Sequence, residues 1–245
     1  MKTTSQPGLA ILLAGSFFVS VLFTSCTSML SAKFESDTIG SLPDKTLPGN
    51  PTGDAMTYVP EIETQLEVIA TPANPAQKSL EYKSVSPSGS VGGHSSWLGF
   101  RAKSTNFSKA ITFVWSAKKE FNTTGPDLYI DCSDGSGVVA ARIKILANGD
   151  VKLVENIATD DGTLVGTIPN GEVHTFMVTV DLPNEKYNLS VLKTSGNITI
   201  TDHALLNENI TLYHNPANPA VSFKYDTYGI AQQYILDEVF INRKN

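Results

Sequence analysis

Hydrophobic and polar residues alternate one by one in many short stretches of the chain, and helical spacing is almost absent. Successive side chains of a β-strand point to opposite faces, so a period of two predicts strands that cover a core with one face. The clearest alternations are Ile111–Trp115, Arg142–Ile145, Val151–Leu153, Phe176–Val180, Tyr187–Val191, Ile198–Ile200 and Val221–Tyr225. We therefore predict an all-β fold, an antiparallel two-sheet sandwich, and the lack of crossover helices excludes parallel βαβ units.

Turn residues separate these alternating stretches. Asn148-Gly149 lies between two of them, and this dipeptide tolerates the positive φ angles of a type I′ turn, so we predict a hairpin there. Residues 160–162, 169–171 and 182–185 predict further chain reversals. Residues 71–96 are rich in Pro, Ser and Gly, which favours a long loop.

The N-terminal residues resemble an export signal. After a positively charged start, Leu9–Phe23 is an almost continuous apolar run of about 15 residues, shorter than the roughly 20 that span a membrane. The segment that ends Thr24-Ser25-Cys26 resembles the bacterial lipobox, in which small residues precede a cysteine that becomes lipidated. We expect residues 1–25 to be a signal peptide, Cys26 to carry a lipid anchor and residues 26–33 to form a tether. The alternative is an ordinary secretory signal followed by an incidental cysteine.

The cysteine content and the net charge further narrow the class of protein. If Cys26 carries lipid, Cys132 has no partner, and the exported chain is expected to contain no disulfide. Because Cys132 follows an apolar stretch, we expect a buried, inert thiol. The hydrophobic content of 41% is enough to build a core. The net charge of −6, with no run of more than two basic residues, argues against a nucleic-acid partner, since phosphates require clustered positive charge.

Both ends of the exported part resemble one family. Phe34–Pro43 is similar to the opening strand and turn of bacterial laminin-G-like, concanavalin-A-like jelly-roll domains, and Tyr234–Ile241 is similar to their final strand. Between them, Glu172–Phe176 and Lys186–Val191 resemble two paired strands of such domains, although Val173 replaces the usual Trp. The resemblance implies a jelly-roll β-sandwich over residues 34–245, with its first and last strands side by side.

The resemblance also implies a structural calcium ion between those two strands. In the alternation of the last strand, Asp237 falls among apolar residues, and a buried carboxylate is costly unless it is paired. Calcium prefers hard oxygen ligands, and Glu35 and Asp37 on the first strand would supply more of them. Alternatively, Asp237 lies at a bulge and faces water, or it accepts hydrogen bonds in a turn.

No catalytic signature of a related enzyme is present in the sequence. Retaining glucanases need two carboxylates about 5 Å apart, but Ile39 and Gly40 stand where the second Glu should follow Glu35 and Asp37. The Gln-Ile-His triplet of alginate lyases is missing, as is the Gly-x-Ser-x-Gly elbow of serine hydrolases. We therefore assign no catalytic residues.

A carbohydrate-binding site requires fewer specific residues than a catalytic site, because sugar rings pack on aromatic side chains while polar groups hold their hydroxyls. Trp97 is the best candidate, with His94 and Arg101 as polar neighbours, although Trp97 would equally fit a core position. Trp115, by contrast, alternates with Ile111 and Phe113 and should be core.

The sequence therefore predicts a non-catalytic, lectin-like protein of the bacterial cell envelope. It is expected to bind carbohydrate and to be lipid-anchored through Cys26, with the outer membrane as the expected location. Two alternatives stay open: a polysaccharide-degrading lyase or glycoside hydrolase on the same scaffold, or a structural envelope protein that binds other proteins.

Overall fold

The computed structural model confirms the all-β prediction. It describes residues 26–47, 55–58, 65–72, 74–84, 96–103, 110–121, 123–134, 137–206, 218–225 and 232–244. Within these ranges the chain forms strands β1 to β15 and one 3₁₀ turn, Phe34–Ser36. No helix among the described residues is both long enough and apolar enough to cross a membrane. The proposed signal peptide, residues 1–25, lies outside the described residues.

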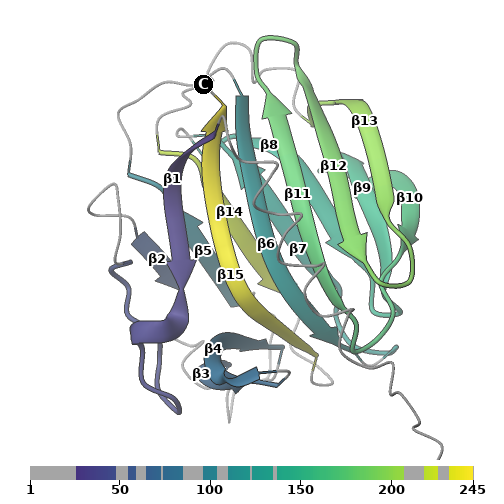
Figure 1. Cartoon of the computed structure of the whole chain (residues 1–245). Helices are drawn as coiled ribbons and strands as arrows, with labels where there is room; N and C mark the ends of the chain where they lie inside the picture. Colours follow the sequence, from purple (N-terminus) through teal and green to yellow (C-terminus); the bar gives the residue numbers. More distant parts are fainter. Residues whose placement is uncertain are drawn as a thin grey trace, which may run out of the picture.

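The strands form two antiparallel sheets that pack face to face (Figure 1). Sheet A has the order β13 (Ile198–Ala204), β12 (Lys186–Lys193), β11 (Val173–Asp181), β6 (Ala110–Glu120), β15 (Gln233–Lys244), β4 (Asn74–Lys83), β3 (Leu66–Thr71), and β1 (Cys26–Lys33) pairs with β15 as well. Sheet B has the order β10 (Asp161–Thr167), β9 (Asp150–Asn156), β8 (Val139–Ile145), β7 (Leu128–Ser133), β14 (Ala220–Tyr225), β5 (Ser96–Arg101), β2 (Ala55–Tyr58).

The first and last described strands lie side by side, as the resemblance implied. However, the first strand is β1, which pairs antiparallel with β15 from Cys26 opposite Lys244 to Lys33 opposite Glu238. The predicted tether at residues 26–33 is therefore wrong, and so is the predicted opening strand from Phe34, because that residue begins the 3₁₀ turn. Met29, Leu30 and Ala32 are buried, so this segment belongs to the core.

Large aromatic side chains join the two sheets in the core. Trp115 on β6 is fully buried and stacks on Phe176 of β11, with ring centroids 4.9 Å apart and ring planes 7° apart. The ring of Phe223, on β14 of sheet B, meets Trp115 edge-on at 5.7 Å. Cys132 is also fully buried, and burial raises the pKa of its thiol. The predicted core positions of Trp115 and Cys132 are confirmed.

The hairpin at Asn148-Gly149 joins β8 to β9 as predicted, but the turn type differs. Gly149 has φ +94°, whereas Asn148 is not among the residues with positive φ. The Gly149 N–H donates to the Leu146 carbonyl at 2.9 Å, and the Leu146 N–H donates to the Asp150 carbonyl at 2.8 Å. This is a three-residue loop in which one glycine in the left-handed region closes the turn, rather than a type I′ turn.

Part of the predicted loop at residues 71–96 is a strand instead. Asn74–Lys83 forms β4, and the C-terminal half of this strand carries the fully buried Leu80 and Tyr82. Together with β3 it forms a hairpin at the edge of sheet A (Figure 1). Residues 73 and 85–95 of the predicted loop lie outside the described residues.

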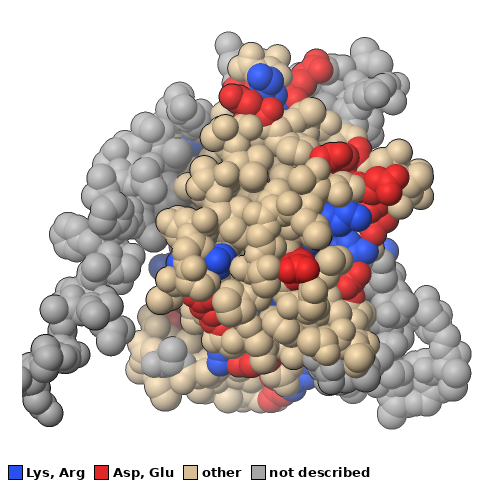
Figure 2. All heavy atoms as spheres, turned by 90° about the vertical axis from the view of Figure 1, so that its right-hand side faces the viewer, with Lys and Arg blue, Asp and Glu red and all other residues tan. Residues whose placement is uncertain are grey.

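The molecular surface on the side of β13 and β10 carries scattered charges of both signs among many uncharged side chains (Figure 2). Lys and Arg do not gather into an extended patch among the described residues on this face.

Candidate functional site

The outer face of sheet B carries the best candidate binding site. Along β5, Leu98 and Phe100 are buried in the core, so their neighbours Trp97, Gly99 and Arg101 fall on the opposite face. Trp97 is 36% exposed, in contrast to the fully buried Trp115. The structure thus resolves the alternatives for Trp97 in favour of a surface position.

The indole of Trp97 lies against the backbone of its own strand. A Cβ atom placed on Gly99 would lie 2.9 Å from Cζ2 of Trp97 and 3.0 Å from its Cη2, which is closer than atoms can pack. The same Cβ would come within 3.3 Å of Oγ1 of Thr57 on the neighbouring strand β2. Glycine at this position therefore leaves room for the indole to lie directly against the backbone of β5.

A cavity of about 430 Å³ opens beside this ring, and we call it the Trp97 cavity. Its walls come from β2, β5, β14, β7 and the start of β8. They combine the indole with hydroxyl groups, a cation and carboxylates: Thr57, Trp97, Arg101, Asp131, Ser133, Asp134 and Ser222. Of the predicted ligand-binding residues, Trp97 and Arg101 therefore share one cavity, while His94 lies outside the described residues.

Asp131 is held rigidly at the edge of the Trp97 cavity. Its two carboxylate oxygens accept hydrogen bonds from Nε and Nη2 of Arg142, at 2.6 and 2.7 Å. Each oxygen of an ionised carboxylate can accept a second hydrogen bond, so Asp131 keeps capacity for a ligand hydroxyl. A bidentate pair of this kind fixes the relative orientation of the two side chains.

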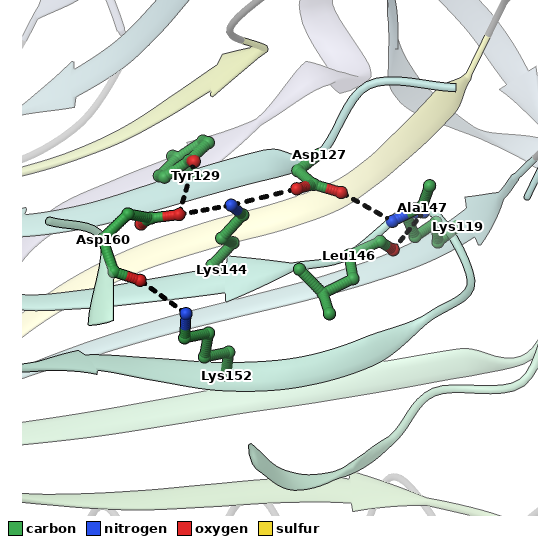
Figure 3. A network of polar contacts seen from close by, with 8 residues as sticks. All are labelled: Lys119, Asp127, Tyr129, Lys144, Leu146, Ala147, Lys152 and Asp160. Carbon is green, nitrogen blue, oxygen red and sulfur yellow. Dashed lines mark hydrogen bonds and ion pairs between the residues drawn. The ribbon is translucent and has the colours of Figure 1, made fainter. Parts of the chain in front are cut away.

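A network of charged side chains continues across the same outer face, over β7, β8 and β9 (Figure 3). Nζ of Lys144 lies 3.0 Å from Asp127 and 2.5 Å from Asp160, and the Tyr129 hydroxyl donates to Asp160 at 3.1 Å. Burial alone would lower the pKa of Lys144, but its hydrogen bonds to these three residues raise it above the ordinary value. Positive and negative side chains of the network pair with one another. These contacts link neighbouring strands and stiffen the sheet next to the cavity.

Another lysine near this network, Lys119 on β6, points into the core between the two sheets. Lys119 is fully buried, and its Nζ donates to Oε1 of Gln232 at 2.8 Å. The same Nζ donates to the Leu146 carbonyl at 3.3 Å (Figure 3). Burial lowers the pKa of Lys119 to about 7, although the charge of Asp127 acts in the opposite direction. These contacts tie β6 to the hairpin that ends β8, which is a structural role.

The three residues of the predicted calcium site do not form a calcium cage. Nζ of Lys78 donates to the backbone carbonyl oxygens of Glu35 and Asp37, at 2.8 and 2.6 Å, so an ammonium group lies beside these two residues. The Asp37 carboxylate accepts the backbone N–H of Asp44 at 3.3 Å. Among the described residues, no group of three His, Cys, Asp or Glu side chains is arranged to hold a metal ion.

Asp237 instead lies at a β-bulge, which is the alternative left open by the sequence. The pairing of β15 with β6 shifts between Leu236 and Glu238, so Leu236 and Val239 both reach the core while Asp237 stays on the outer face of sheet A. Burial raises the pKa of Asp237, and the nearby charge of Glu35 adds to this effect. Glu35 and Asp237 thus lie on the same flank, as expected for paired first and last strands.

Several residues of the Trp97 cavity were not singled out by the sequence. Asp131 and Ser133 alternate with buried residues on β7, so their outward position is predictable from the strand pattern. Their approach to Trp97 depends on β14, which lies between β5 and β7 and follows β7 by more than eighty residues in the chain. No local pattern encodes that neighbourhood.

Comparison with known proteins supports the fold. No protein-family model and no curated protein sequence matches the chain. Among solved structures, the lectin UEA-II complexed with galactose aligns with 89% of this chain and 100% of its own, at 12% sequence identity and a TM-score of 0.51. The binding domain of botulinum neurotoxin DC in complex with SialylT aligns with 90% of this chain and 48% of its own, at 10% identity and a TM-score of 0.52.

A sialidase is also similar, with 74% of this chain aligned at 11% identity and a TM-score of 0.50, but the chain spans only 17% of that protein's length. Identities this low show a shared jelly-roll β-sandwich and do not by themselves transfer a ligand.

Proposed function

We propose that the protein binds carbohydrate in the Trp97 cavity on the outer face of sheet B. The observation that carries this proposal is the partly exposed indole of Trp97, which lies against Gly99 beside a cavity lined with hydroxyl and carboxylate groups. An indole in this position offers an apolar platform to the face of a sugar ring. Asp131, Ser133 and Ser222 offer hydrogen bonds to sugar hydroxyls at the edge of that platform.

The similar structures agree with this reading at the level of fold. The lectin UEA-II is complexed with galactose, and the neurotoxin binding domain is in complex with SialylT. Galactose-terminated and sialic-acid-terminated oligosaccharides are therefore reasonable first probes.

The proposal includes attachment to the bacterial cell envelope through a lipid on Cys26. Its support is the lipobox-like sequence that ends at this cysteine. Since β1 begins at Cys26, such an anchor would hold the sandwich close to the membrane surface, without a spacer. Mass spectrometry of the N-terminal peptide from the membrane fraction tests this part: a diacylglycerol-modified Cys26 supports it, and an unmodified one contradicts it.

Replacing the platform should remove most of the affinity. We expect Trp97→Ala to weaken binding of an array-selected galactose- or sialic-acid-terminated oligosaccharide by about tenfold, because a stacked aromatic ring contributes on the order of 1 kcal/mol or more. Isothermal titration calorimetry measures the change. Leu164→Ala is the matched control, since Leu164 is also exposed but lies on β10, at the far edge of the same sheet.

Gly99→Ala provides a second, independent variant that retains the indole. The added methyl group would displace the ring from the sheet, so we expect weaker binding without loss of folding. Unchanged affinity in both variants would contradict the proposal. Release of products from polysaccharide substrates would favour the enzyme alternative instead.

A further inference from the structure

A second cavity, of about 340 Å³, lies on the outer face of sheet A. It is enclosed by the β3–β4 hairpin on one side and by residues of β6, β11 and β15 on the other. We call it the Asp237 groove, after the residue at its polar end. The Trp97 cavity lies on the other sheet, so the two cavities face opposite sides of the sandwich.

Aliphatic side chains line part of the Asp237 groove, beside polar residues of the β3–β4 hairpin such as Asn74 and Gln77. Ile235 is 6% exposed and lines the floor, while Val173 is 54% exposed and stands at the wall. The described residues that line the groove include no aromatic side chain. A sugar ring would find no platform here, whereas an unbranched aliphatic chain would bury its methylene groups against this surface.

The polar end of the groove is a carboxylate held by hydroxyl groups. Oγ of Ser79 donates to Oδ1 of Asp237 at 3.3 Å, and Oγ of Ser79 lies 2.7 Å from Oγ1 of Thr71. Ser79 is fully buried, so its hydroxyl is fixed in this position. Hydroxyl donors leave the carboxylate with its full negative charge, and each of its oxygens accepts more than one hydrogen bond.

The lysines around Asp237 are engaged elsewhere. Lys33 lowers the pKa of Asp237 through its charge, but its ammonium lies 3.9 Å from Glu238. Lys118 at the groove wall pairs with Glu120 at 2.5 Å. The ammonium of Lys78 is bound to two backbone carbonyls of the neighbouring 3₁₀ turn and its end. Asp237 is therefore the one carboxylate among the described residues that line the groove, and the one cation among them, Lys118, is paired with Glu120.

We propose that the Asp237 groove binds a primary ammonium group carried on an unbranched aliphatic arm, as in a lysine side chain or a diamine. The arm lies along Ile235 and Val173, and the ammonium group pairs with the Asp237 carboxylate at the end of the groove. A charged hydrogen bond formed in a partly buried site is stronger than one in open water, which makes Asp237 the main determinant of affinity.

Binding of two probes to the full chain tests this proposal. We expect both Nα-acetyl-L-lysine methylamide and cadaverine to bind in NMR titrations, and the matching norleucine amide, which lacks the ammonium group, to bind at least tenfold more weakly. If only the lysine amide binds, the natural ligand is a protein or peptide; if cadaverine binds as well, free amines are also accepted.

Variants locate the binding. Asp237→Asn should weaken binding of both amines at least tenfold, and Val173→Ser should weaken it several-fold, because Val173 supplies the aliphatic wall and is exposed enough to be replaced without unfolding. Asp202→Asn is the matched control: Asp202 is an exposed carboxylate on β13 with φ +55°, a conformation that Asn adopts readily. It should leave binding unchanged.

Absence of amine binding to the wild-type chain would overturn the inference, as would equal binding by the norleucine amide or by the Asp237→Asn variant. The Trp97→Ala variant should retain amine binding, and Asp237→Asn should retain carbohydrate binding. The two proposals can therefore fail separately.

Discussion

Trp115→Ala is expected to lower the free energy of unfolding by about 4 kcal/mol, the cost typical of removing a large buried aromatic ring. The side chain has no solvent exposure, and its ring packs between Phe176 of sheet A and Phe223 of sheet B. Its indole N–H also donates to the hydroxyl of Tyr234 at 3.0 Å, so truncation removes a hydrogen bond from a buried group. Urea unfolding followed by far-ultraviolet circular dichroism measures this loss.

Trp97→Ala is the natural control for this experiment. Trp97 is 36% exposed and lies on the outer face of sheet B, so its removal should cost less than about 1 kcal/mol of stability. If both substitutions cost the same, the assignment of one tryptophan to the core and the other to a binding surface would be wrong.

His174 is expected to make the protein less stable as the pH falls from about 6.5 to about 4. The side chain is 1% exposed, and burial lowers its pKa from 6.5 to about 4; Glu172 acts in the opposite direction and the charge of Lys119 in the same direction. In this window the unfolded chain binds a proton at His174 and the folded chain does not. Stability contributed by neutral His174 is therefore complete above pH 6.5 and falls by about 3 kcal/mol towards pH 4.

The geometry around His174 explains why the neutral form is required. Nδ1 lies 3.1 Å from the Glu172 carbonyl, which can only accept, so Nδ1 carries the proton. Nε2, 3.1 Å from the Tyr234 hydroxyl, must then accept the hydrogen bond from that hydroxyl. A second proton on Nε2 would remove this acceptor inside the core.

His174→Gln separates this effect from other groups that titrate. Gln retains an acceptor for Tyr234 but takes up no proton. Asp237 and Glu238 have raised pKa values, mainly through burial, and their effect on stability has the opposite sign. Unfolding free energies of wild type and variant should therefore be compared at pH 7 and pH 4.5. The wild type should lose about 2 to 3 kcal/mol more than the variant; parallel losses would mean that His174 does not titrate as described.

The regular strands were predictable because each buries one face. Ile111, Phe113 and Trp115 on β6 and their partners on β11 show the alternation directly, and the paired strands match it. The same rule identifies Trp115 as core, and it applies equally to Trp97, whose neighbours Leu98 and Phe100 are buried. The alternation along β5 is harder to recognise in the sequence, because Gly99 has no side chain that would show which face it occupies.

The wrong predictions concern elements that depend on contacts between distant parts of the chain. Residues 26–33 are largely small and polar, and they form β1 only because β15 offers a free edge beyond the point where β4 leaves it. The bulge at Asp237 likewise shows only in the pairing with β6. A period-two reading assigns Asp237 to the wrong face because one extra residue reverses the alternation.

The central claim, that sugar binds on the outer face of sheet B, is tested most directly by chemical-shift mapping of the isotope-labelled protein with an array-selected galactose- or sialic-acid-terminated oligosaccharide. We expect the largest shifts on the indole N–H of Trp97 and on the backbone amides of Gly99, Asp131 and Ser222, which line one cavity on three neighbouring strands. Shifts confined to sheet A or to the β10 edge would contradict it.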